Sequence, residues 1–136
     1  MVGKNIAEQF GVKLGNIVQE FGYDDDVDEA LREHIEQLTG EPFEDEDYRG
    51  IADVVLAWWR SDDGNVDDLT DYLMDCAGSL EDGSGVIWCM VPSGHSDYHV
   101  STADVSEAAQ LAGQSATTTF AISREWTAIR VVARGR

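Results

Sequence analysis

The chain has 136 residues, 43% of them hydrophobic, and its 27 acidic and 9 basic side chains give a formal net charge of −18. This size and apolar content predict a single domain, residues 1–136, with a hydrophobic core of its own. The sequence contains neither a run of roughly 20 apolar residues that could span a membrane nor a basic-then-apolar secretory signal. We therefore expect a cytoplasmic protein with no membrane partner.

The acidic side chains are concentrated in the first part of the chain. Residues 1–82 contain 23 acidic and 5 basic side chains, a balance of −18, whereas residues 83–136 contain 4 of each. Nucleic acid phosphates and anionic lipids are bound through Lys and Arg, so this charge predicts no direct nucleic acid binding. Two interpretations of the acidity remain open. It keeps a small protein in solution, or it forms a docking face for a protein partner with a basic surface.

The first elements expected along the chain are a short helix, a strand and a longer helix. Asn5 is a favoured cap for a helix that would end at Gly11. Apolar residues between two glycines then predict a strand within residues 14–22. Residues 27–39 carry apolar side chains at spacings of three and four, which is the pattern of an amphipathic helix, and Asp26 is its expected cap.

A second strand is expected after an acidic connection. Residues 41–49 hold five carboxylates and predict a solvated loop. Residues 51–59 are apolar apart from Asp53 and predict a buried strand. Successive side chains of a strand point to opposite faces of the sheet, so Trp58 and Trp59 are expected on different faces, and one of them can reach a surface or a cleft.

The next helix and strand have the clearest patterns. Asn65 and Asp68 have the spacing of a capping box, and apolar residues at helical spacing continue over residues 66–80. Residues 85–92 form a continuous apolar run closed by proline, which is typical of a strand buried on both faces at the centre of a sheet. Each element contains one of the two cysteines, which we expect to be free thiols packed as small hydrophobic groups.

After Pro92 the sequence predicts a polar loop, a helix and a hairpin. Ser101, with Asp104, can cap the helix. Residues 116–122 and 126–133 are two β-rich runs joined by three residues, which predicts an antiparallel hairpin at the edge of the sheet.

Helices and strands therefore alternate until the final hairpin. This order predicts a three-layer α/β fold, with a Rossmann-like sheet of mostly parallel central strands and a C-terminal antiparallel hairpin. Such a layout is methyltransferase-like.

Five segments of the sequence resemble a known family. They are residues 18–28, 45–48, 53–60, 85–88 and 126–130, and the string Gly-Tyr-Asp-Asp-Asp-Val-Asp in the first of them is specific. From about Phe10 to Ala133 the chain resembles domain of unknown function 3052, a family common in high-GC Gram-positive bacteria. The resemblance implies no established biochemical activity. The family has a basic residue soon after the proline of the central strand, where this chain has Ser-Gly-His-Ser, so an anion-binding role of that loop is weaker here.

The end of the first strand is where a Rossmann-like sheet would bind a nucleotide or S-adenosylmethionine. Glu20 and Gly22 resemble the start of the required loop, but Tyr23 and three aspartates follow in place of further glycines. The aspartates would put the protein's own anions at the positive end of the next helix, where a phosphate or carboxylate would otherwise sit. We interpret this as a degenerate site and expect no cofactor.

No metal site and no catalytic residue are expected. Asp24, Asp26 and Asp28 copy the first ligand positions of a calcium-binding EF-hand loop, but the glycine and the last glutamate that the loop requires are missing. His95 and His99 are four residues apart in a loop that does not hold them at helical spacing. The nucleophile motif of a hydrolase does not accompany them.

Two hypotheses of function follow. The first is a non-catalytic interaction or regulatory domain that presents acidic side chains to a basic protein partner, with Trp59 as an apolar anchor. The acidic side chains are Asp24, Asp25, Asp28, Glu44, Asp45, Glu46 and Asp47. The second is a small-molecule binder or enzyme that uses the crevice at the carboxyl ends of the strands. Its candidate residues are Glu20, Gly22, Tyr23 and His95. A third hypothesis is that the acidic side chains mimic the charge of DNA, which requires regularly spaced carboxylates.

Overall fold

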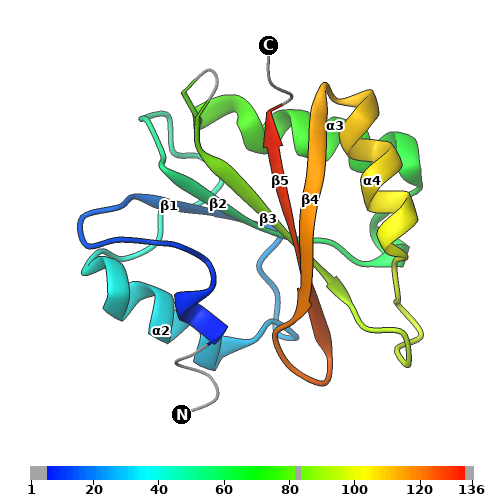
Figure 1. Ribbon diagram of the computed structural model, residues 1–136, viewed down its shortest axis with the longest axis horizontal. Coiled ribbons are helices and arrows are strands. Elements are labelled where there is room, and N and C mark those ends of the chain that lie inside the picture. The colour runs from blue at the N-terminus through cyan, green and yellow to red at the C-terminus, as the bar shows by residue number, and fades with distance from the viewer. Residues whose placement is uncertain (1–5, 82–83, 134–136) are drawn as a thin grey trace.

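The computed structural model describes residues 6–81 and 84–133, and within them five strands form one sheet (Figure 1). The strands are β1 Val18–Phe21, β2 Val54–Trp58, β3 Val86–Pro92, β4 Gln114–Ala121 and β5 Trp126–Ala133. Their spatial order is β1-β2-β3-β5-β4. The first three are parallel, and β5 pairs antiparallel with both β3 and β4. The expected α/β fold with a terminal antiparallel hairpin is confirmed.

Helices cover both faces of the sheet and produce three layers (Figure 1). They are α2 Glu29–Thr39, α3 Val66–Cys76 and α4 Thr102–Leu111, with short 3-10 turns η1 Ser61–Asp63 and η2 Ala77–Ser79. α2 packs on one face, whereas α3 and α4 lie side by side on the other. The expected first helix is a single turn at residues 6–8, and its expected cap, Asn5, lies outside the described residues. Among the described helices, none is long and apolar enough to cross a membrane.

Polar side chains fix the starts of α3 and α4. The Asn65 side chain accepts a hydrogen bond from the backbone N–H of Asp68, and the Asp68 carboxylate accepts one from the backbone N–H of Asn65. At α4 the Ser101 hydroxyl accepts a hydrogen bond from the backbone N–H of Asp104 at 3.1 Å. Each bond satisfies an N–H that has no partner inside its helix. Both predicted caps are confirmed.

The start of α2 differs from the prediction. The Asp28 side chain accepts a hydrogen bond from the backbone N–H of Leu31 at 3.0 Å and caps the helix. Asp26, the predicted cap, instead pairs its carboxylate with Arg60, so that prediction is wrong. A carboxylate binds a guanidinium through two charge-assisted bonds and a backbone N–H through one. The helix ends at Gly40, whose φ of 75° provides a left-handed cap.

β3 lies at the middle of the core. Ile87, Cys89 and Val91 point to the face covered by α3 and α4, whereas Trp88 and Met90 point to the face covered by α2. None of the five is more than 2% exposed. The strand is therefore buried on both faces, as its continuous apolar sequence predicts. Both cysteines of the chain are free and buried.

The two adjacent tryptophans point to opposite faces of the sheet, as predicted. Trp58 packs edge-on against Trp126 with 4.9 Å between ring centroids, and Trp59 lies 4.7 Å from the ring of Tyr72. They are 0% and 6% exposed, so neither protrudes from the surface, but Trp59 lines a cavity at this edge of the sheet, as predicted for one of the two. β2 is also shorter than predicted, because Ile51 lies outside it and is 58% exposed.

The connection from α2 to β2 takes an indirect path. Glu44 forms a single parallel bridge with Gln19 at the outer edge of β1, and its backbone N–H donates to the carbonyl of Val18 at 2.9 Å. The chain then passes to the other side of β1, where β2 pairs with it. At the opposite edge of the sheet, the register of β4 on β5 shifts between Ala116 and Thr118, which marks a β-bulge.

Replacement of Leu73 by alanine tests the packing of α3 on the sheet. Leu73 is 0% exposed, so Leu73→Ala leaves a cavity and should lower the free energy of unfolding by about 2–5 kcal/mol. Met74, its neighbour, is 54% exposed, and Met74→Ala should change that free energy by no more than about 0.5 kcal/mol. Urea unfolding followed by circular dichroism measures both. Equal losses would contradict the orientation of α3.

Candidate functional site

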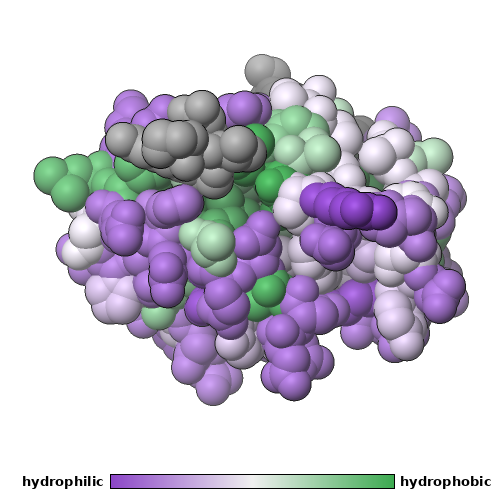
Figure 2. Space-filling view, turned by 90° about the horizontal axis from the view of Figure 1, so that it is seen from below, coloured by the Kyte–Doolittle hydropathy of each residue, from purple (hydrophilic) through white to green (hydrophobic). Residues whose placement is uncertain are grey.

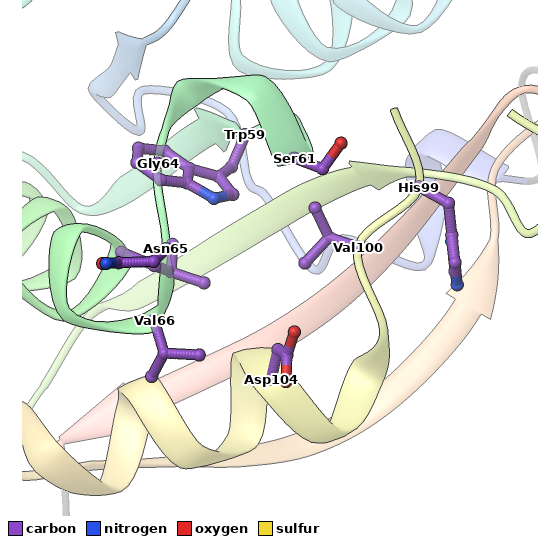
Figure 3. A pocket seen from close by; sticks show the side chains of 9 residues that line it. Trp59, Ser61, Gly64, Asn65, Val66, His99, Val100 and Asp104 are labelled. Carbon is purple, nitrogen blue, oxygen red and sulfur yellow. The ribbon is translucent and has the colours of Figure 1, made fainter. Parts of the chain in front are cut away.

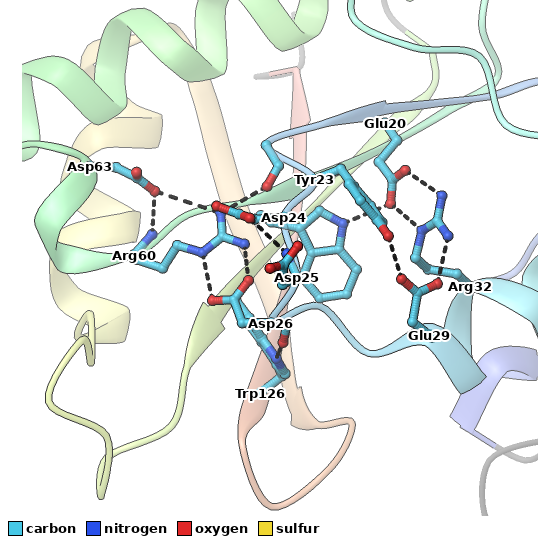
Figure 4. Close-up of polar contacts among 12 residues, drawn as sticks. Glu20, Tyr23, Asp24, Asp25, Asp26, Glu29, Arg32, Arg60, Asp63 and Trp126 are labelled. Atoms are coloured by element: carbon cyan, nitrogen blue, oxygen red, sulfur yellow. Dashed lines mark hydrogen bonds and ion pairs between the residues drawn. The ribbon is translucent and has the colours of Figure 1, made fainter.

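The crevice beyond the carboxyl ends of β1 and β2 is the candidate site. In an open α/β sheet, ligands bind where successive connections run to opposite faces of the sheet. Here the chain leaves β1 for α2 on one face and leaves β2 for α3 on the other. The side chains that meet between the two strand ends are shown in Figure 4.

Arg60, which follows β2, occupies this crevice (Figure 4). Its Nη1 donates to the carbonyl of Gly22 at 2.8 Å, and its Nε and Nη2 donate to the two carboxylate oxygens of Asp26, Nε at 3.0 Å. The guanidinium also lies 5.4 Å from the ring centroid of Trp126. The hydrogen bonds from Arg60 lower the pKa of Asp26. Arg60 is only 8% exposed, so a side chain of the protein itself stands where a ligand would bind.

The ends of β1 and β2 also approach each other closely, and α3 packs against them. The hydroxyl of Tyr72 donates to the carbonyl of Trp58 at 2.9 Å, and burial raises the pKa of Tyr72, which keeps the hydroxyl a neutral donor. Gly22 has a φ of 76°, and a Cβ there would overlap the Trp58 carbonyl and lie 2.6 Å from the Tyr72 hydroxyl. Glycine is required for both reasons. Gly22, which resembles part of the start of a cofactor loop, therefore allows the ends of the two strands to come together.

Glu20 and Tyr23 take part in a network centred on Arg32 (Figure 4). The Glu20 carboxylate accepts hydrogen bonds from Nε and Nη2 of Arg32, each at 2.7 Å, and from Nε1 of Trp58 at 2.9 Å. Tyr23 donates to Glu29 at 2.6 Å, a bond that raises the pKa of Tyr23, and its ring centroid lies 4.6 Å from the Arg32 guanidinium. Glu20 raises the pKa of Arg32. Both candidate cofactor residues thus have partners within the protein.

His95, the remaining candidate, is exposed in the loop after β3 and makes no hydrogen bond or ion pair with a described residue. His99 takes a more defined position in the same loop. Its Nδ1 lies 2.9 Å from the carbonyl of Pro92, which only accepts hydrogen bonds, so Nδ1 carries a proton. The sequence suggested His99 only as a metal ligand beside His95, and the structure places it at the border of a cavity.

This cavity of about 400 Å³ opens between the starts of α3 and α4 (Figure 3). Trp59, Leu69 and Val100 contribute apolar walls, and Ser61 and Asp104 contribute polar groups. The cavity lies beyond the ends of β2 and β3, next to the crevice that Arg60 occupies. It is the larger of the two hollows at this edge of the sheet, because the space left around Arg60 between the ends of β1 and β2 is about 280 Å³.

Metal ligation and thiol chemistry find little support in the part of the chain that the structure describes. No three His, Cys, Asp or Glu side chains in residues 6–81 and 84–133 are placed to hold a metal ion. Burial raises the pKa of Cys89 to about 12, so this thiol is not ionised at neutral pH and is a poor nucleophile.

The acidic residues suggested for partner binding divide into two groups. Asp24, Asp25, Asp45, Glu46 and Asp47 are exposed. Asp28 and Glu44 are half-buried, because one caps α2 and the other bridges to β1. Glu46 lies beside the crevice, where its Oε2 accepts a hydrogen bond from the backbone N–H of Gly22 at 2.9 Å. On the face of the molecule seen in Figure 2, hydrophilic side chains also predominate.

Arg60 and Arg32 are the site residues that sequence reasoning missed. Arg60 directly follows a predicted strand and Arg32 lies within a predicted helix, in a part of the chain with only five basic residues. The scarcity of cations among so many acids is the one signal that could have drawn attention to them. It does not reveal which carboxylates they meet.

Comparison with known proteins identifies uncharacterized relatives. The family model DUF3052, described as a protein of unknown function, matches residues 7–135. An uncharacterized protein of Mycobacterium bovis and one of Mycobacterium tuberculosis are each 40% identical to the chain over 128 residues, which cover 94% of this chain and 78% of theirs. The resemblance seen in the sequence is confirmed.

Solved structures with a similar fold are methyltransferases and related proteins. Magnesium protoporphyrin IX methyltransferase of Synechocystis PCC 6803, with bound SAM, has a TM-score of 0.61 at 14% identity, covering 98% of this chain and 78% of that one. The TehB-like SAM-dependent methyltransferase of Corynebacterium glutamicum has a TM-score of 0.56 at 13% identity, and the match covers 97% of this chain and 88% of that one. The pyocyanin biosynthetic protein PhzM has a TM-score of 0.72 at 11% identity, and the match covers 54% of that protein, about half of its length. At these identities the likeness shows the fold alone, and the methyltransferase-like fold is confirmed.

Replacement of Asp26 tests the ion pair with Arg60 through its pH dependence. Because Arg60 lowers the folded-state pKa of Asp26, the pair stabilises the protein above about pH 4 and is lost as the pH falls through the folded-state pKa. Asp26→Asn should lower the free energy of unfolding at pH 7 by about 1 kcal/mol, a modest figure because the Asp26 side chain is 52% exposed.

The variant should also lose less stability than the wild type between about pH 5 and about pH 3. Asp25→Asn is the matched control, since Asp25 is exposed and forms no ion pair with a described residue. Urea unfolding at several pH values measures both variants. Parallel pH curves for Asp26→Asn and the wild type would show that the ion pair does not contribute.

Proposed function

The chain belongs to the DUF3052 family of proteins of unknown function, and we propose that it is a non-catalytic interaction or regulatory domain that binds a protein partner with a basic surface. The domain uses a methyltransferase-like fold as a scaffold. Its working surface is what we call the acidic side, formed by the exposed carboxylates of Asp24, Asp25, Asp45, Glu46 and Asp47.

The position of Arg60 in the crevice is the observation that carries this proposal. Arg60 stands between the ends of β1 and β2, bound to the Gly22 carbonyl and to both carboxylate oxygens of Asp26. A cofactor in this place would have to displace the guanidinium, which would leave the Asp26 carboxylate without its cation and a carbonyl without its donor. The cost of that displacement opposes cofactor binding.

The exposed carboxylates supply the second half of the proposal. Asp24, Asp25 and Asp47 are exposed, and none forms an ion pair with a described residue. Such charges speed and steer the encounter with a basic partner, and their effect weakens as salt screens them. Trp59 is buried and supplies no anchor, so the proposed interface relies on polar contacts.

A charge-matched pair of variants tests this interface. The triple variant Asp24→Asn, Asp25→Asn, Asp47→Asn removes three exposed charges from the acidic side. The control Asp97→Asn, Glu107→Gln, Glu125→Gln removes three exposed charges from the part of the chain that is neutral overall. Affinity capture from the native host, with mass spectrometry at low and physiological salt, compares the two with the wild type.

We expect the wild type and the control to retain the same basic partner, more strongly at low salt, and the acidic-side variant to lose most of it. Equal capture by the two triple variants would contradict the proposal. Capture that does not depend on salt would contradict it too.

A small-molecule binder is the second candidate, and the cavity between α3 and α4 favours it. The indole of Trp59 forms part of its wall, and the Nε1 of Trp59 has no hydrogen-bond partner among the described residues. Several proteins of similar fold have SAM bound, as the Synechocystis methyltransferase does. The cavity volume of about 400 Å³ falls within the range of small-ligand sites.

A thermal-shift screen with SAM and nucleotides separates the two candidates. A ligand that binds only the folded state raises the midpoint of thermal unfolding. At a ligand concentration of about a hundred times Kd, the folded state is stabilised by about 2.7 kcal/mol. We expect no rise for the interaction domain. A rise that Ser61→Phe abolishes, because the larger side chain would fill the cavity mouth, would place the ligand there and favour the second candidate.

A further inference from the structure

A second hollow, of about 430 Å³, lies on the acidic side of the molecule between the loop at residues 45–49 and the end of α3. Gln19 forms its floor, and Glu46, Asp47 and Asp75 line it. The loop is held in place from below, because Nε2 of Gln19 donates to the carbonyls of Asp45 and Tyr48 at 3.0 and 3.3 Å. The hollow is therefore built by long-range contacts.

The charge of this hollow is not balanced by the protein. Glu46, Asp47 and Asp75 form no ion pair with a described residue. Arg49 also lines the hollow, but its Nη1 donates to the backbone carbonyls of Glu46, Asp47 and Tyr48, at 2.9 Å for Asp47. Its guanidinium thus holds the loop and forms no ion pair with these carboxylates.

Gln19 adds an independent observation. It is 1% exposed, and its Oε1 is buried without a hydrogen-bond partner among the described residues. The nitrogen and oxygen of the amide cannot be exchanged, because the nitrogen faces two carbonyls, and carbonyls only accept hydrogen bonds. Buried polar atoms almost always have a partner. A donor for this oxygen has to come from outside the described residues, and a group bound in the hollow could supply it.

In the part of the chain that the structure describes, the unpaired acceptors of the hollow are the neutral Oε1 of Gln19 and the carboxylates of Asp47 and Asp75, whereas Glu46 has one of its two oxygens bound to the backbone N–H of Gly22. Within the described residues they are not placed as a metal site. An arginine side chain suits them better than a lysine, because its planar guanidinium carries five N–H donors and stays charged. The rings of Phe21 and Tyr48 also line the hollow, and a guanidinium stacks well on aromatic rings.

We propose that this hollow receives an arginine side chain of the protein partner, with the guanidinium between the carboxylates of Glu46, Asp47 and Asp75 and above the amide of Gln19. The inference rests on the proposed function, because it names the residue type by which a basic partner would be recognised. It adds a specific pocket to what is otherwise a general attraction between charged surfaces.

The test uses the full chain, labelled with ¹⁵N, and N-acetylarginine amide as the probe. N-acetylcitrulline amide has almost the same shape without the charge, and N-acetyllysine amide has the charge without the planar fork. NMR titration follows the side-chain NH₂ of Gln19 and the backbone amide of Gly78, which also lines the hollow. We expect saturable shifts with the arginine probe, weaker ones with lysine and none with citrulline.

Asp75→Asn should lower the affinity for the arginine probe severalfold. Glu107→Gln, which removes an exposed charge from α4, should leave that affinity unchanged. The spectrum of each variant shows whether it is folded. Equal shifts with citrulline, or an Asp75→Asn variant that binds the probe like the wild type, would overturn the proposal.

Capture of the basic partner distinguishes this inference from the proposed function. If Asp75→Asn captures a salt-sensitive partner as well as the wild type does, the acidic interface stands and the arginine pocket is wrong. If the arginine probe binds as expected but no salt-sensitive partner is captured, the pocket stands and the proposed function is wrong.

Discussion

A buried carboxylate at the end of β1 sets the arrangement of the elements around it. Glu20 is 7% exposed, and an ionised group in such a place must be paired. Arg32 of α2 supplies the opposite charge, and Trp58 of β2 supplies a further hydrogen bond. The guanidinium of Arg32 is in turn placed against the rings of Tyr23 and Phe43. One carboxylate therefore joins β1, α2 and β2, and α2 must lie on the sheet in the position that brings Arg32 to it.

The same pairing leaves few cations on the surface. Two of the five basic residues in positions 1–82, Arg32 and Arg60, are turned inward to neutralise Glu20 and Asp26. Arg49 donates to backbone carbonyls. The remaining carboxylates of this part of the chain consequently face the solvent with fewer cations than the composition suggests. Arg60, which occupies the crevice, is thus also one of the cations that the surface lacks.

Local patterns predicted the elements well, because the interactions that decide them are close in sequence. The capping box of Asn65 and Asp68 spans three residues, and the burial of β3 follows from a continuous apolar run. The wrong cap of α2 has a different origin. Either Asp26 or Asp28 satisfies the local rule, and the choice depends on Arg60, which lies 34 residues beyond Asp26. The position of Arg60 in the crevice could not be predicted for the same reason, since chain order alone does not bring these groups together.

The two edges of the sheet differ from the straight, open edges that make β proteins prone to associate. At β1, Glu44 occupies a place in the ladder, and exposed carboxylates follow it. At β4, the bulge between Ala116 and Thr118 interrupts the row of backbone groups that another chain would need in register. Strand addition is thus discouraged at both ends of the sheet. This molecule should stay dispersed when concentrated, and fibril growth by edge-to-edge stacking has no ready template in its folded state.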